Sequence, residues 1–202
     1  MTESNGTVPG TVTGSTTFSA AGLYNVTVSV TDSSGLTSTV GRQVVVYDPS
    51  AGFVTGGGWI MSPPGAYKAD ERQSGRATFG FVSKYLKGAN KPTGETEFRF
   101  QAGGLNFYSN NYDWLVVGGA RAQYKGTGVI NGRGSYQFLL TAVDGDLIGK
   151  GTADRFRIKI WHRDDSTNAD VTDYDNQINS TAAGSDQEGT VIGGGSSSVK
   201  IR

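Results

Sequence analysis

The most constraining feature of this sequence is the alternation of apolar and polar residues within short segments that glycine-rich turns separate. Phe156, Ile158 and Ile160 alternate with charged residues, and Phe98 and Phe100 do the same. Successive side chains of a β-strand point to opposite faces, so a period of two puts one face of each strand on a core and the other in water. Such half-buried strands are typical of antiparallel sheets. The sequence therefore predicts an all-β protein.

Segments of this kind follow one another after residue 51 at the short spacing that is typical of sandwiches and jelly rolls. No window shows apolar residues at helical spacing, and the 31 glycines are about twice ordinary usage. We therefore predict a larger antiparallel β-sandwich or jelly-roll-like domain over residues 51–202. Its expected strands cover residues 53–61, 76–85, 96–101, 105–109, 113–117, 121–127, 135–143, 155–163, 171–176 and 191–201.

Residues 1–50 form a separate unit in this interpretation. The stretch "YNVTVSVT" from Tyr24 alternates cleanly, the turn "DSSGLTS" follows it, and "RQVVVYD" marks a returning strand. Residues 16–19 are the expected strand before it. The stretch resembles the last strands of a PKD-type immunoglobulin-like domain, in which Tyr24 would be a tyrosine corner. The resemblance implies a partial immunoglobulin-like sandwich that lacks its opening strands.

An incomplete sandwich of this kind leaves apolar surface and strand edges uncovered, because three strands cannot bury both faces of two sheets. The unit must contact the second domain, pair with another chain or remain partly loose. Strand donation from a neighbouring copy would satisfy the open edge. Self-association is therefore one expected way to complete the unit, and a monomeric mass that stays constant with concentration in light scattering would contradict it.

The second domain contains "TGGGWI", "FGFVSKY", "LNFYSNNYDWLVV" and "DRFRIKIWH". Together these stretches resemble an uncharacterised β-rich domain that follows PKD repeats at the carboxyl ends of bacterial secreted or surface proteins. The resemblance implies an extracellular or cell-surface module from a longer exported protein, and it carries over no catalytic or binding residues. Met1 precedes "TESNGTV", which has neither a basic start nor an apolar core, so we expect no signal peptide in this chain.

Two glycine triplets mark the ends of the second domain, Gly56–Gly58 before Trp59 and Gly193–Gly195 near the last residue. The first triplet lacks the lysine and the serine or threonine of a phosphate-binding Walker loop, and it opens no helix. Glycine inside a strand instead permits a bulge or a close backbone approach. We predict that the two glycine-containing strands are neighbours and that Trp59 packs over bare glycine backbone.

Charge and residue usage exclude several function classes. The 18 basic residues balance the 18 acidic ones, which argues against binding to nucleic acid. No apolar run is long enough for a transmembrane helix. The chain contains no cysteine and a single histidine, His162, which we expect to be exposed at a strand end. A cysteine nucleophile is therefore absent, a zinc enzyme is disfavoured, and no G-x-S-x-G serine elbow occurs.

Acidic residues gather in two predicted loops, "DGDLIGKGTAD" and "HRDDSTNADVTDYDN". Calcium takes six to eight oxygen ligands, which loops rich in aspartate can supply. The first loop begins like an EF-hand but has Arg155 where the pattern needs a glutamate. The alternative is that these residues form turns. Structural calcium is the one cofactor that the sequence suggests, with ligands from Asp144, Asp146, Asp164, Asp165, Asp173 and Asp175.

The stretch "LNFYSNNYDWLVV" is the richest in aromatic residues. Its two adjacent asparagines suggest a turn, and therefore a tight hairpin with aromatic side chains near its tip. We expect Phe107 and Trp114 to fill the core. The expected exposed ligand-binding residues are Tyr108, Asn111 and Tyr112, because aromatic rings with polar groups suit contacts with sugars or proteins.

These observations predict a protein that is not an enzyme but an extracellular module for adhesion, for glycan or protein binding, or for a surface assembly. Glycan binding predicts solvent-facing aromatic residues on one sheet face. The alternative is a secreted hydrolase of polysaccharides, which needs two carboxylates at a suitable separation. Glu95 and Glu97, two residues apart on an expected strand, would share a face and supply that pair.

Overall fold

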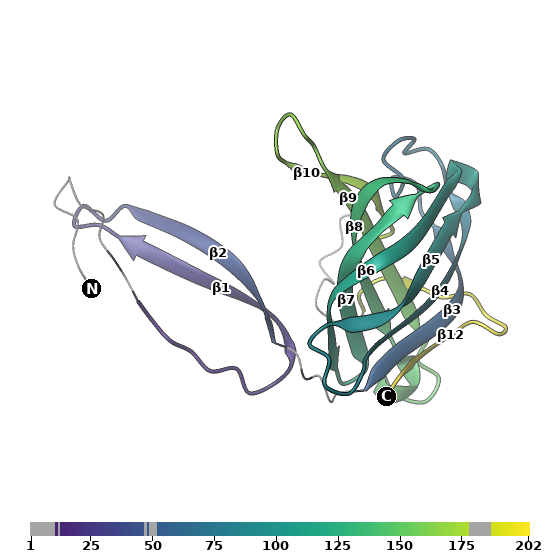
Figure 1. Cartoon of the computed structure of the whole chain (residues 1–202), viewed down its shortest axis with the longest axis horizontal. Coiled ribbons are helices and arrows are strands. Elements are labelled where there is room, and N and C mark those ends of the chain that lie inside the picture. Colours follow the sequence, from purple (N-terminus) through teal and green to yellow (C-terminus); the bar gives the residue numbers. More distant parts are fainter. Residues whose placement is uncertain (1–10, 12, 47, 49–51, 178–186) are drawn as a thin grey trace.

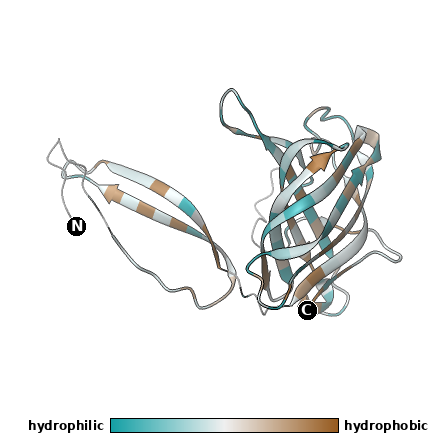
Figure 2. Cartoon of the chain, in the orientation of Figure 1, coloured by the Kyte–Doolittle hydropathy of each residue, from teal (hydrophilic) through white to brown (hydrophobic). Residues whose placement is uncertain are grey.

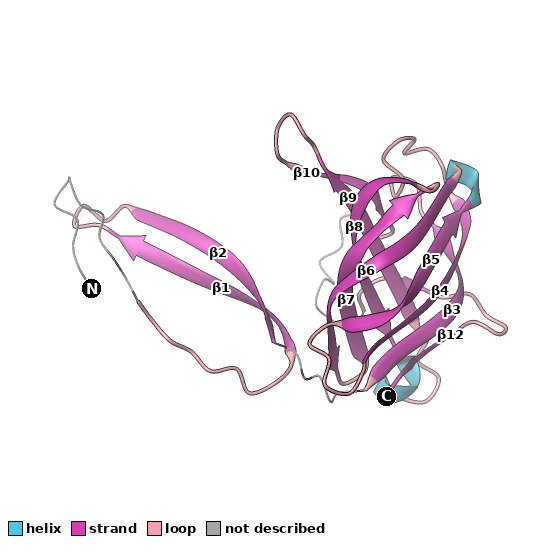
Figure 3. Ribbon diagram, viewed as in Figure 1, coloured by secondary structure: helices cyan, strands magenta, loops and turns pink. Residues whose placement is uncertain are grey.

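The computed structural model shows a protein built almost entirely of antiparallel strands (Figure 1, Figure 3). The all-β class is therefore confirmed. The strands form two sheets that share no strand, one of two strands and one of ten. The structure describes residues 11, 13–46, 48, 52–177 and 187–202.

The smaller sheet is a hairpin of β1 (Gly22–Thr31) and β2 (Thr37–Val46). Its alternation is visible as apolar bands along both strands (Figure 2). One face carries Val28 and Val40, which are paired across the hairpin and both exposed. Residues 16–19 carry no strand, so that part of the sequence prediction is wrong. The self-association expected of this unit stays a prediction.

Tyr24 fixes the start of the hairpin to the segment before it. Its hydroxyl donates to the Ala20 carbonyl oxygen at 2.8 Å, and its ring lies 4.3 Å from that of Phe18. A tyrosine hydroxyl that bonds to backbone a few residues upstream is the contact that a tyrosine corner makes. The resemblance to a PKD domain stays a prediction.

The larger sheet is a meander in which each strand from β3 to β10 pairs with the next, and β12 joins beside β3. β11 pairs with the first two residues of β9, on the same edge as β10, which pairs with the later residues of that strand. Two short helical turns, η1 and α1, interrupt the meander. The bounds are β3 (Phe53–Ser62), β4 (Gly75–Tyr85), β5 (Pro92–Phe100), η1 (Gln101–Gly103), β6 (Leu105–Gly118), β7 (Arg121–Ile130), β8 (Arg133–Val143), α1 (Gly145–Ile148), β9 (Arg155–Arg163), β10 (Asp170–Asp175), β11 (Thr190–Val191) and β12 (Ser198–Ile201).

The larger sheet curls into a half-barrel, so that its two halves face each other across one core as the layers of a sandwich do (Figure 1). Phe79 of β4 stacks on Phe156 of β9 with ring centroids 4.0 Å apart, although the two strands are far apart in the sheet order. Tyr174 of β10 lies 4.7 Å from Phe98 and donates its hydroxyl to Ser62 of β3 at 2.9 Å. The alternating residues of the sequence thus meet in one core.

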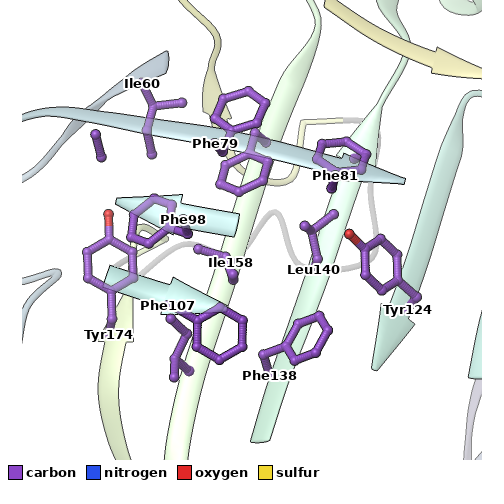
Figure 4. Close-up of a cluster of buried hydrophobic side chains, with 14 of the residues drawn as sticks. Ile60, Phe79, Phe81, Phe98, Phe107, Tyr124, Phe138, Leu140, Ile158 and Tyr174 are labelled. Carbon is purple, nitrogen blue, oxygen red and sulfur yellow. The ribbon is translucent and has the colours of Figure 1, made fainter. Parts of the chain in front are cut away.

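Aromatic side chains dominate this core (Figure 4). Burying one such side chain contributes on the order of 1.5–3 kcal/mol. The largest fully buried side chains are Tyr124, Tyr174, Phe98, Phe100, Phe107, Phe138, Phe156, Ile60, Leu105, Leu115, Leu140 and Ile158. A hydroxyl group inside the core needs a partner, and the Thr96 hydroxyl lies 2.8 Å from the hydroxyls of both Tyr112 and Tyr124.

The last strand closes the curl. β12 pairs with β3 in antiparallel register, so that Val199 lies opposite Gly56. The amide groups on its other edge face two carboxylates. Asp154 accepts from the Val199 amide at 2.7 Å, and Asp144 accepts from the Ile201 amide at 3.1 Å. Both strand residues are buried, and the carboxylates supply the acceptors that a further strand would otherwise provide.

Both glycine triplets act as the sequence predicts. β3 carries the first triplet and pairs with β12, which follows the second, and the Gly193 amide in the loop before β12 donates to the Trp59 carbonyl oxygen at 2.7 Å. A β-carbon on Gly193 would lie 1.9 Å from the indole ring of Trp59, and one on Gly56 would lie 2.6 Å from the ring of Phe81. Glycine is required at both positions because an aromatic ring occupies the space of a side chain.

Two strand predictions are wrong in detail. The asparagine pair at 110 and 111 forms no turn, because Leu105–Gly118 is one strand with bulges after Ser109 and after Tyr112. Each bulge adds one residue to β6 relative to its partner strand. The extra residue interrupts the alternation, so the sequence pattern suggests that the strand ends there. Residues 191–201 form two short strands, β11 and β12, which border β9 and β3.

The contact between Gly193 and Trp59 predicts an asymmetry within the second triplet. We expect Gly193→Ala to lower the free energy of unfolding by about 1–3 kcal/mol, because the methyl group displaces the indole ring. Gly194→Ala is the matched control, since nothing lies within 4 Å of its added carbon, and it should change stability by less than about 0.5 kcal/mol. Urea unfolding of both variants measures the difference, and equal losses would contradict this packing.

Buried tyrosines predict a loss of stability at alkaline pH. Burial raises the pKa of Tyr124 and Tyr174 well above the ordinary value of 10.0, while unfolded tyrosines ionise near that value. The unfolded chain therefore loses protons that the folded chain keeps. The free energy of unfolding should fall as pH rises above about 10, by up to about 1.4 kcal/mol per pH unit for each tyrosine.

Urea titrations between pH 8 and pH 11 measure this slope. Tyr124→Phe should reduce it by about one proton, although it also removes the hydrogen bond to Thr96. A slope above pH 10 that Tyr124→Phe leaves unchanged would show that this hydroxyl does not titrate as described.

Candidate functional site

The outward face of strands β3 to β6 carries polar and aromatic side chains in cross-strand rows. The register pairs Trp59 with Thr78, Thr78 with Arg99, and Arg99 with Asn106. The same register forms a second row from Gly57, Gly80, Glu97 and Tyr108. Side chains directly opposite one another on one face are near neighbours. The first row is therefore a line of indole, hydroxyl, guanidinium and amide groups across four strands.

A groove of about 680 Å³ lies over this face. Its volume falls within the range of about 300–1,000 Å³ that is usual for ligand sites. A smaller hollow of about 210 Å³ adjoins it at Thr78 and Glu97, where Gly80 has no side chain. The residues that line the groove are Arg76, Thr78, Arg99, Gln101, Gly104 and Asn106.

Arg76 forms one wall of the groove, and Trp59 supports it from outside the lining. The guanidinium carbon of Arg76 lies 4.7 Å from the centroid of the Trp59 ring, a cation–π contact. Trp59 in turn packs on Gly193, so the closure of the sheet by the last residues also holds this wall in place. Arg76 is exposed, and among the described residues it makes no ion pair.

Arg99 lies in the middle of the groove and is held by two neighbours on the same face. It donates to the Tyr108 hydroxyl at 2.6 Å and forms an ion pair with Glu97. The hydrogen bond to Tyr108 and the charge of Glu97 raise the pKa of the Arg99 guanidinium. The ring of Tyr108 lies 5.7 Å from the guanidinium carbon and is 39% exposed. The groove therefore presents a fixed cation beside an accessible aromatic ring.

Asn131 anchors the far end of the groove. Its side-chain oxygen accepts from the backbone amide and the side-chain amide of Asn106, both at 3.1 Å, and its own amide donates to the Gly104 carbonyl at 3.0 Å. Asn131 has a positive φ of 52°, a conformation that asparagine tolerates better than most residues. The β7–β8 turn thus orients two lining residues on β6 and the loop before it.

The three expected ligand-binding residues have different positions. Tyr108 is on the outward face beside the groove and is exposed, as expected. Tyr112 is only 5% exposed and bonds to Thr96 and Ser109 inside the sheet, so its assignment as an exposed residue is wrong. Asn111 is exposed but does not line the groove. The first bulge in β6 inverts the face of Tyr112, which alternation alone does not reveal.

The two aromatic residues expected in the core also differ. Phe107 is fully buried there. Trp114 is half-buried and lies opposite Lys125, outside the core cluster. The second bulge restores the alternation that the first one shifts, so Leu115 points inward like Phe107 and Trp114 does not.

Three of the aspartates that suggested calcium, Asp144, Asp146 and Asp175, form ion pairs with basic side chains. Asp144 and Asp146 both approach Lys200, at 3.5 and 2.6 Å, and Asp175 makes a bidentate pair with Arg157. Among the described residues no three acidic or histidine side chains form a group that could hold a metal ion. Structural calcium stays a prediction.

In the second acidic loop, the Asp164 carboxylate accepts hydrogen bonds from residues of the same loop. Asp164 accepts from the backbone and side chains of Ser166 and Thr167, and these bonds lower its pKa well below the ordinary value. Asp165 is exposed. Asp173 lies 2.8 Å from the ring of His162, which is half-buried near the end of β9 rather than exposed.

Glu95 and Glu97 share the outward face of β5, as their spacing predicts. Glu97 borders the small hollow and pairs with Arg99. The six residues that line the main groove include no carboxylate. The sequence reasoning missed most of this site, although Arg76, Thr78, Arg99 and Asn106 are the polar partners of core residues in alternating strands.

Comparison with protein-family models, curated proteins and solved structures found no match to this chain. No helix within the described residues is both long and apolar enough to span a membrane.

Proposed function

We propose that this protein is a non-catalytic extracellular module that binds saccharides in the groove over β4, β5 and β6. The observation that carries the proposal is the cross-strand row of Thr78, Arg99 and Asn106, with Tyr108 beside it. Sugar hydroxyls need several fixed hydrogen-bonding groups, and the apolar face of a sugar ring suits an exposed aromatic ring.

Rigidity supports this proposal. The lining residues lie on hydrogen-bonded strands, and Asn131, Glu97 and Tyr108 hold their side chains through specific contacts. A preformed site loses little side-chain entropy when a ligand binds. The extracellular setting rests on the sequence resemblance alone.

The lining of the groove also favours binding over hydrolysis. Glycoside hydrolysis needs two carboxyl groups that flank the scissile bond about 5–9.5 Å apart. The only carboxylate in the adjoining hollow, Glu97, is paired with Arg99, and the main groove has none among its lining residues. The hydrolase alternative would require Glu95 to act with Glu97 from the same strand.

A glycan array followed by calorimetry tests the proposal. We expect binding to at least one saccharide, a loss of at least about tenfold in affinity for Tyr108→Ala, and no release of reducing ends from the bound saccharide. Asn111→Ala is the matched control on the same strand, since this exposed residue lies outside the groove. The proposal fails if no saccharide binds, or if both variants weaken binding equally.

A further inference from the structure

Arg76 is the cation in the groove whose charge has no acidic partner among the described residues. The nearby arginines differ from it in this respect, since Arg99 pairs with Glu97 and Arg72 pairs with Asp70. An exposed, unpaired arginine on a surface is ordinary, but Arg76 is held at the wall of a groove by its contact with Trp59. Its position is therefore fixed before any ligand arrives.

The contact with the indole ring also determines what Arg76 can bind. A guanidinium over an aromatic ring uses its planar face for that contact, so its N–H donors remain available around the edge of the plane. These donors match the two oxygens of a carboxylate in a bidentate pair. Thr78, two residues after Arg76 and therefore on the same face of β4, adds a neutral hydroxyl to the lining.

The rest of the groove favours the same kind of ligand. Its six lining residues carry two positive charges and no negative one, and Glu97 offsets only the charge of Arg99. An acidic ligand would therefore enter a locally positive site in a chain whose total charge is balanced. A neutral sugar would leave the Arg76 guanidinium without an ion-pair partner.

We propose that the groove recognises saccharides that carry carboxylate groups, such as polymers of uronic acids, and that Arg76 is the residue that binds the carboxylate. The inference rests on the proposed function, because it specifies the ligand class of the same groove. In this arrangement Arg76 pairs with the carboxylate, while Asn106 and Gln101 bond to hydroxyls and Tyr108 packs against a sugar ring.

The test compares oligogalacturonate with its methyl ester, which has the same sugar ring without the charge. Calorimetry at low salt should show that the wild-type chain binds the acid at least about tenfold more tightly than the ester. Arg76→Gln should remove this preference by weakening binding of the acid far more than binding of the ester. Arg76→Lys should retain part of the preference, because it keeps the charge but loses the bidentate geometry.

Arg72→Gln is the matched control, since its side chain is 91% exposed and lies outside the groove. It should bind the acid as the wild type does, and all variants should keep the wild-type melting temperature. Equal binding of acid and ester, or an unchanged preference in Arg76→Gln, would overturn the carboxylate assignment and leave saccharide binding standing. An absence of binding to both, repeated across the glycan array, would overturn the proposed function as well.

Discussion

The carboxyl-terminal strand β12 has one strand partner, and the fold depends on how its other edge is satisfied. The amides of Val199 and Ile201 belong to buried residues and point away from β3, and a buried donor left unsatisfied costs about 1–3 kcal/mol. Asp154 and Asp144 accept from these amides, and the same carboxylates accept from the amides of Gly145 and Asp146 in the turn after β8. Two side chains from one loop thus replace a missing strand and hold the curled sheet together.

The segment that leads into β12 also supports the candidate site. β12 follows the segment that places Gly193 against Trp59, and Trp59 in turn carries the guanidinium of Arg76. Residues from the two ends of the domain therefore support Arg76 at the groove, through a contact that only glycine permits. The other side of the groove depends only on the adjacent strands β5 and β6, which carry Arg99, Glu97 and Tyr108.

Most of the fold follows from the sequence because alternation reports the two faces of a strand directly. It places Phe98, Phe156 and Ile158 in the core, and the two triplets indicate which distant strands meet. The errors arise where the alternation shifts. The first bulge in β6 turns Tyr112 inward and the second restores the earlier alternation, and the sequence composition does not reveal either shift. The groove is also invisible in the sequence, because its residues share a face only once the register of four strands is known, and the carboxylates of Asp144 and Asp154 read as turn or calcium residues.

Amide hydrogen exchange on β12 tests the central claim most directly. In the wild-type chain, NMR should show slow exchange at Val199 and Ile201, as in the core strands, although these amides face no strand. Asp154→Ala should accelerate exchange at Val199 far more than at Ile201, because Asp144 still accepts from the latter. Rapid exchange at Val199 in the wild type, or a variant that exchanges as slowly as the wild type, would contradict the claim that carboxylates close the sheet.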